Sequence, residues 1–152
     1  MRRKYFFLGC LIALFMSCKE NPSQPVQLTP YERWQSFHLH NYTIDQVRMC
    51  FCPGAGGTVR ITIRSDTIAL VMRLLDSTYV PSPIPQYYLT VDSLFSIIRT
   101  RSGDSIVVTY NETYGYPEKL DINPQQHPVD GGVLFETSNL QILFNWDGND
   151  KS

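Results

Sequence analysis

Two cysteines one residue apart, Cys50 and Cys52, are the side chains of this chain most able to do chemistry. On a regular strand their Cα atoms would lie about 6.5–7 Å apart on one face, near the upper limit for a disulfide. Pro53 and Gly54 follow directly and could supply the bend that pairing needs. We interpret the pair as a structural disulfide, which closes so small a loop that it stabilises little through chain entropy.

Two other chemistries stay open for these cysteines. A disulfide in a small ring is relatively oxidising, which would suit thiol exchange, although the sequence shows no nearby base to lower a thiol pKa. With His38 and His40, the cysteines would also supply four ligands for zinc or copper. Two histidines at i and i+2 face together only on an extended segment, whereas these fall at the end of a predicted helix.

Three tyrosines, Tyr110, Tyr114 and Tyr116, could form an aromatic platform that binds a sugar or a peptide. Tyrosine is equally the usual half-buried residue of a strand. The run Tyr114-Gly-Tyr-Pro117 also has the composition of a hairpin turn with a glycine at positive φ. Both roles stay open.

Enzyme motifs are missing from the sequence. It contains no nucleophile elbow, phosphate-binding loop, zinc-protease motif or catalytic triad pattern. We therefore expect no catalytic residues and no cofactor, and a secreted enzyme of an unrecognised type stays open as an alternative.

The first 18 residues indicate where the protein goes. Three basic residues at positions 2–4 precede an apolar run that is too short to cross a bilayer and is typical of a secretory signal. The run ends in Leu14-Phe-Met-Ser-Cys18, which resembles a bacterial lipoprotein signal, in which the cysteine is lipidated and becomes the first residue. We predict a signal peptide over residues 1–17 and lipidation of Cys18. An uncleaved anchor and ordinary secretion are the alternatives.

The rest of the chain divides into three parts. Residues 18–28 form the lipidated cysteine and a flexible, proline-containing tether. A single domain is predicted over residues 29–146 and a frayed C-terminus over residues 147–152. The 14 acidic residues outnumber the basic ones once the signal is removed, and no basic cluster exists. This argues against nucleic-acid binding, which draws most of its affinity from Lys and Arg contacts with phosphates.

Helix signals occur at two places. Thr29-Pro-Tyr-Glu32 matches a capping box and predicts a helix of about ten residues that ends near His40-Asn41. Thr90 is the predicted N-cap of a second helix, which carries an apolar stripe to about Thr100.

Three strand candidates follow each helix. They cover residues 42–51, 58–64, 68–75, 105–110, 118–122 and 133–144, the last of them broken near Ser138-Asn139. This order predicts an α+β fold: a single domain of two helix-plus-three-strand units, whose antiparallel sheet has helices on one face.

Several short elements resemble a family of short bacterial lipoprotein domains, a domain of unknown function. The resemblance covers roughly residues 31–144, and the family usually has Asp where this chain has Asn111. Its markers are Trp34 with Asn41-Tyr-Thr43, Cys50-Phe-Cys-Pro53, Val59-Arg-Ile-Thr-Ile63, Thr90-Val-Asp-Ser-Leu-Phe95 and Tyr114-Gly-Tyr-Pro117. The resemblance implies a fold and a cellular address and carries no activity.

These patterns predict a lipoprotein of the bacterial cell envelope, anchored in a membrane by palmitate-type acyl chains on Cys18. We expect it at the outer membrane, on the periplasmic side or at the cell surface. Its domain is predicted to be a non-catalytic binding or structural module whose partner is an envelope protein, a peptide or a glycan. The alternative is a thiol-redox or metal-handling protein that uses Cys50 and Cys52.

Overall fold

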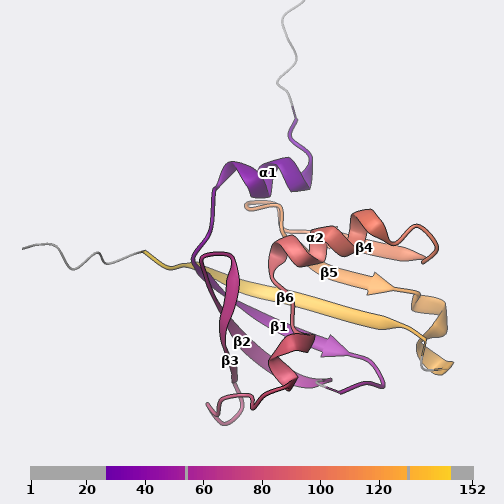
Figure 1. Ribbon diagram of the computed structural model, residues 1–152. Helices are drawn as coiled ribbons and strands as arrows, with labels where there is room; N and C mark the ends of the chain where they lie inside the picture. Colours follow the sequence, from indigo (N-terminus) through magenta and orange to yellow (C-terminus); the bar gives the residue numbers. More distant parts are fainter. Residues whose placement is uncertain (1–26, 54, 130, 145–152) are drawn as a thin grey trace, which may run out of the picture.

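A six-stranded antiparallel sheet dominates the structure, in the strand order β3-β2-β1-β6-β5-β4 (Figure 1). This computed structural model describes residues 27–53, 55–129 and 131–144. The predicted signal peptide, Cys18 and the predicted frayed C-terminus lie outside the described residues. The strands are β1 (Tyr42–Met49), β2 (Gly56–Arg64), β3 (Thr67–Arg73), β4 (Ile106–Tyr110), β5 (Pro117–Ile122) and β6 (Val133–Ile142). The helices are α1 (Pro30–Ser36), α2 (Val91–Thr100) and the 3₁₀ helices η1 (Ile84–Tyr87) and η2 (Pro124–Val129).

The predicted α+β architecture of two helix-plus-three-strand units is wrong. The last strand, β6, lies between β1 and β5 and pairs with both, so strands from both halves share one continuous sheet. The two α-helices have only seven and ten residues, which makes the fold roughly all-β. The physical reason is strand pairing: the ten-residue β6 pairs along both of its edges and joins the strands of the two halves, so neither half forms a unit of its own.

The first helix is held at one end of the sheet. Its capping box is confirmed, because Thr29 N donates to Glu32 Oε2 at 2.8 Å and Glu32 N donates to Thr29 Oγ1 at 3.3 Å. The helix ends at Ser36, earlier than predicted, and the next residues include His38 in the left-handed region with φ of 49°. Neither α1 nor any other helix among the described residues is long and apolar enough to cross a membrane.

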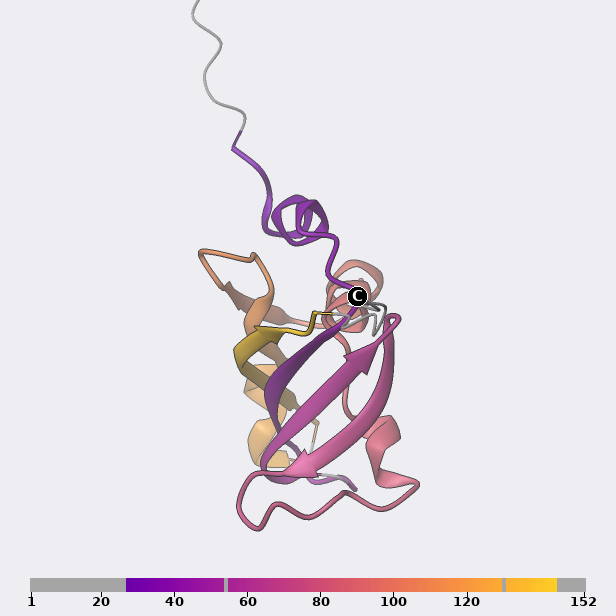
Figure 2. The same ribbon diagram turned by 90° about the vertical axis from the view of Figure 1, so that its left-hand side faces the viewer.

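The second helix and η1 lie together on one face of the sheet (Figure 2). The side chains of β2, which covers the strand predicted over residues 58–64, alternate along the sheet, because Val59, Ile61 and Ile63 are buried whereas the residues between them are more exposed. The buried side chains pack in one cluster with Val91 and Phe95 of α2. A smaller cluster joins α2 to the other half of the sheet through Leu94, Leu120, Ile122 and Phe135.

The predicted break in the last strand takes the form of a bulge. β6 runs on to Ile142, but its register with β1 shifts between Thr43 and Asp45, and Asn139 adopts a φ of 53°. The bulge lets Asn139 Nδ2 donate to Asp45 Oδ2 at 2.9 Å. The irregularity therefore holds a side chain in place rather than ending the strand.

Candidate functional site

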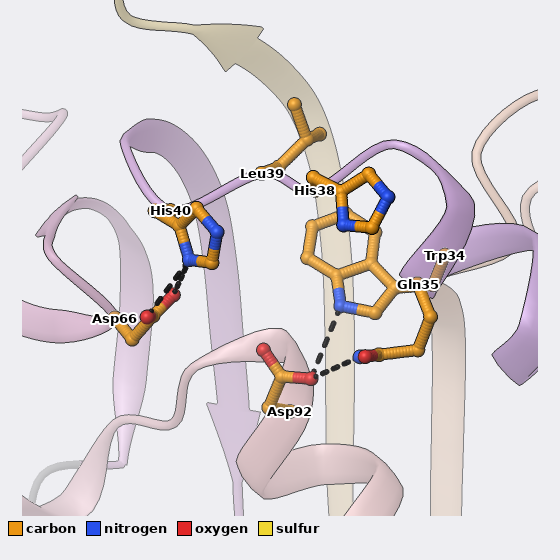
Figure 3. Close-up of a pocket in the computed structure, with 7 residues that line it drawn as sticks. All are labelled: Trp34, Gln35, His38, Leu39, His40, Asp66 and Asp92. Carbon is orange, nitrogen blue, oxygen red and sulfur yellow. Dashed lines mark hydrogen bonds and ion pairs between the residues drawn. The ribbon is translucent and has the colours of Figure 1, made fainter.

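A pocket of about 270 Å³ opens where α1 leads into β1 (Figure 3). Besides the connection between α1 and β1, the end of α1, the turn between β2 and β3, and the first turn of α2 border it. We call it the corner pocket. It is lined by Trp34, Gln35, His38, Leu39, His40, Asp66 and Asp92.

One carboxylate joins the two helices beside this pocket. Trp34 Nε1 and Gln35 Nε2 both donate to Asp92 Oδ1, at 3.3 and 2.9 Å, as Figure 3 shows. Asp92 lies in the first turn of α2, where the helix dipole favours a negative charge. Trp34 itself is 2% exposed and packs edge-on against Tyr42. The position of this carboxylate is therefore fixed by contacts from two elements.

A second carboxylate borders the pocket from the turn between β2 and β3. His40 Nδ1 lies 3.0 and 2.9 Å from the two carboxylate oxygens of Asp66. The backbone supports the same contact, because Asp66 N donates to His40 O at 3.1 Å. Both side chains are more than half exposed, so solvent screens the pair. The lining of the pocket thus includes two carboxylates together with the apolar side chains of Trp34 and Leu39.

Buried polar side chains of β1 position the start of α2. Tyr42 Oη accepts a hydrogen bond from Val91 N at 3.1 Å, and burial raises the pKa of this phenol. Gln46 makes two bonds with the backbone of Leu89, donating to its oxygen at 3.2 Å and accepting from its nitrogen at 3.0 Å. These bonds satisfy groups that would be costly to bury unpaired, and they fix Asp92 relative to the sheet.

The structure brings Cys50 and Cys52 into contact after β1, with 5.3 Å between their Cα atoms. This separation lies in the range that disulfides span, and the pairing of the two cysteines stays a prediction. Cys50 also lines a hollow of about 330 Å³ together with His127. His127 Nε2 lies 2.7 Å from Asp121 Oδ1. Sequence spacing could not indicate that His127 is a neighbour of Cys50, because these two residues are far apart in the chain.

The proposed metal ligands do not come together. His38 and His40 precede β1 and the two cysteines follow it, so the eight-residue strand separates the pairs by about 25 Å. Among the described residues, no group of three or more His, Cys, Asp and Glu side chains could hold a metal ion.

The three tyrosines lie within the packing around the helices rather than on an exposed platform. Tyr116 is 4% exposed, Tyr110 stacks against Phe95 with 6.0 Å between ring centroids, and Tyr114 contacts Phe37 at 4.9 Å. Their loop also supports α1, since an Arg33 guanidinium nitrogen donates to Glu112 O. This placement favours the structural role that the sequence left open.

Sequence patterns missed the residues that build the corner pocket. Asp92 lies two residues after the predicted N-cap Thr90, and Asp66 lies between the strands predicted over residues 58–64 and 68–75. Trp34 was marked by the family resemblance alone. Nothing in local spacing indicates that these three side chains meet, because the meeting depends on how α1 crosses the end of the sheet.

Comparison with known proteins places the chain in a family. The model of a family of unknown function, DUF6174, matches residues 28–142, so the chain belongs to this family. The match covers most of the described domain and confirms a domain of unknown function. No curated protein and no solved structure matches the chain significantly.

Proposed function

We propose that this member of DUF6174 is a lipoprotein of the bacterial cell envelope whose domain binds a partner without catalysis. The observation that carries the binding role is the corner pocket, where Asp66 and Asp92 are fixed on separate elements around one hollow. The address rests on the sequence before residue 19, with acyl chains on Cys18 as the membrane anchor. Residues 27–29 are exposed, which suits a tether that leads away from the domain.

The chemistry of the pocket favours a ligand that carries a primary ammonium group. Ionised carboxylates only accept hydrogen bonds, so Asp66 and Asp92 suit a positively charged donor. Trp34 and Leu39 provide apolar contact for the carbon atoms beside that group. A lysine side chain of an envelope peptide and an amino sugar of a glycan both have this combination.

Binding is measured through the fluorescence of Trp34. The chain has two tryptophans, so Trp146→Phe leaves Trp34 as the single reporter. The probes are glucosamine and lysine amide, with N-acetylglucosamine as the matched neutral sugar. The ammonium probes should change the emission, and Asp66→Asn should weaken their binding by about tenfold, the loss of one charged hydrogen bond. Asp76→Asn, on the loop after β3, is the matched control.

Two results would contradict the binding role. One is an equal response to glucosamine and N-acetylglucosamine. The other is no response to either ammonium probe while the circular dichroism spectrum shows a folded protein.

A thiol-redox protein is the second candidate, and one contact favours it. His127, which is hydrogen-bonded to Asp121, lines the same hollow as Cys50, so a base could assist a thiol there. If so, His127→Ala should slow reduction of the Cys50–Cys52 disulfide by dithiothreitol near neutral pH. Unchanged reduction rates in this variant would leave the cysteines with a structural role only.

A further inference from the structure

A third hollow, of about 200 Å³, lies on the helix-bearing side of the sheet beside η1 and α2. Its walls combine two arginines with apolar side chains, and we call it the Arg48 cleft. The residues that matter for its chemistry are Arg48, Tyr87, Ile97, Arg101, Ile122 and Phe135.

Arg48 is a half-buried cation without a carboxylate partner among the described residues. Its Nη1 donates to Pro53 O at 2.9 Å, whereas its Nε is buried and makes no hydrogen bond to the described part of the chain. Burial also lowers the pKa of this guanidinium. A buried charge is costly unless it is paired, so an anion that binds here would supply the missing ion pair of the Arg48 guanidinium.

Two aromatic rings hold the guanidinium in place. Its central carbon lies 5.3 Å from the ring centroid of Tyr87 and 5.8 Å from that of Phe135. Such contacts attract a cation to the ring face and restrict its rotation. Because the side chain is already oriented, a ligand that binds it loses less free energy in ordering the site.

Arg101 supplies a second positive charge to the same cleft. It caps the end of α2, and its Nη1 bonds to Asp104 Oδ2 at 3.0 Å. Half of its side chain is exposed, so it can reorient toward a ligand at little cost. Ile97 and Ile122 line the same cleft and offer an apolar surface.

We propose that the Arg48 cleft binds a small free carboxylate that has an apolar body. The carboxylate pairs with Arg48 and Arg101, since its two oxygens match the planar donors of a guanidinium. The hydrocarbon part packs against Ile97 and Ile122. The volume of about 200 Å³ selects a small ligand. This site shares no residue with the corner pocket, so either proposal can fail alone.

Calorimetric titration of the mature protein with octanoate, below its micelle concentration, tests the site. Octanamide is the neutral probe of the same shape. Octanoate should bind, and octanamide should bind at least about tenfold more weakly, because it lacks the charge that a guanidinium pairs with. Arg48→Gln should weaken octanoate binding by a similar factor.

Controls separate a lost contact from a lost fold. Arg101→Gln changes a half-exposed side chain and should weaken octanoate binding without unfolding the protein. Arg99→Gln removes an arginine of the same helix that lies over Tyr31 instead, and it should bind octanoate as the wild type does. The proposal would be overturned if the folded wild type did not bind octanoate or bound octanoate and octanamide equally. It would also be overturned if the folded single variants Arg48→Gln and Arg101→Gln both bound octanoate as tightly as the wild type.

Discussion

Trp34 and Asp92 connect the two helices across the end of the sheet, through an indole nitrogen and a carboxylate oxygen 3.3 Å apart. The same oxygen accepts from Gln35, so one side chain of α2 holds two side chains of α1. Because α1 has only seven residues, it is too short to be stable alone and depends on such contacts. The hydrogen bond between Trp34 and Asp92 therefore stabilises the first helix and also fixes the positions of two residues that line the corner pocket.

Removal of this acceptor should destabilise the domain. Asp92→Ala leaves the nearly buried Trp34 nitrogen without its partner, so we expect the free energy of unfolding to fall by about 1–3 kcal/mol. Asp92→Asn keeps an oxygen at the same place and should cost less. Urea denaturation followed by tryptophan fluorescence measures both. Equal stability of wild type and Asp92→Ala would contradict the contact.

Gly115 should not tolerate a side chain. It has a φ of 81°, and a Cβ there would lie 2.2 Å from Pro30 O, inside the contact between its loop and α1. Gly115→Ala should therefore lose well over the roughly 1 kcal/mol that a left-handed backbone alone costs. Gly103→Ala is the matched control, because nothing lies within 4 Å of its Cβ position. Thermal melts of the two variants should differ clearly, and similar melts would argue against this packing.

Asp45 should be essential to the sheet. Its carboxylate is 1% exposed and accepts from Arg60 Nε and Nη2 at 2.7 and 3.0 Å, and also from Asn139. Asp45→Ala leaves these donors unpaired, so the expected loss in unfolding free energy is about 3 kcal/mol.

The exposed pair of Arg101 and Asp104 provides the comparison for Asp45. Arg101→Ala should cost less than about 1 kcal/mol. If denaturation curves gave Asp45→Ala and Arg101→Ala the same small loss, Asp45 would not hold the sheet together.

The capping box predicts part of the response to acid. The backbone N–H and the hydroxyl of Thr29 lower the pKa of the Glu32 carboxyl in the folded protein. A lowered folded-state pKa contributes stability above the unfolded value, and this contribution is lost as the pH falls through the folded one. The melting temperature should therefore fall from about pH 5 to about pH 3 by more in the wild type than in Glu32→Gln. Glu112→Gln controls for the loss of a carboxylate, and an identical pH response of Glu32→Gln and wild type would contradict the prediction.

Local structure could be predicted from the sequence, because the interactions that determine it are close in the chain. The capping box at Thr29, the N-cap at Thr90 and the alternation of Val59, Ile61 and Ile63 all involve residues a few positions apart. The turn around Gly115 follows the same rule, and its positive φ agrees with the predicted hairpin composition.

The sheet order and the sites could not be predicted, because they depend on contacts between distant segments. No periodicity shows that β6 pairs with β1 as well as with β5. The same limit explains why the division into two units failed and why the meeting of Trp34 with Asp92 was missed. The approach of Tyr87 and Phe135 to Arg48 likewise depends on strand order, since Phe135 lies opposite Arg48 on β6.

The central claim is a lipid-anchored envelope protein, and acylation of Cys18 tests it most directly. Cells that produce the full-length chain are labelled with an alkyne analogue of palmitate, and the purified protein is examined by intact-mass spectrometry. Cys10→Ser is the matched control, because it changes the other cysteine of the N-terminal segment. We expect a chain that begins at residue 18 and carries label in wild type and Cys10→Ser, with no label in Cys18→Ser. An unlabelled wild type, or label that persists in Cys18→Ser, would contradict the account.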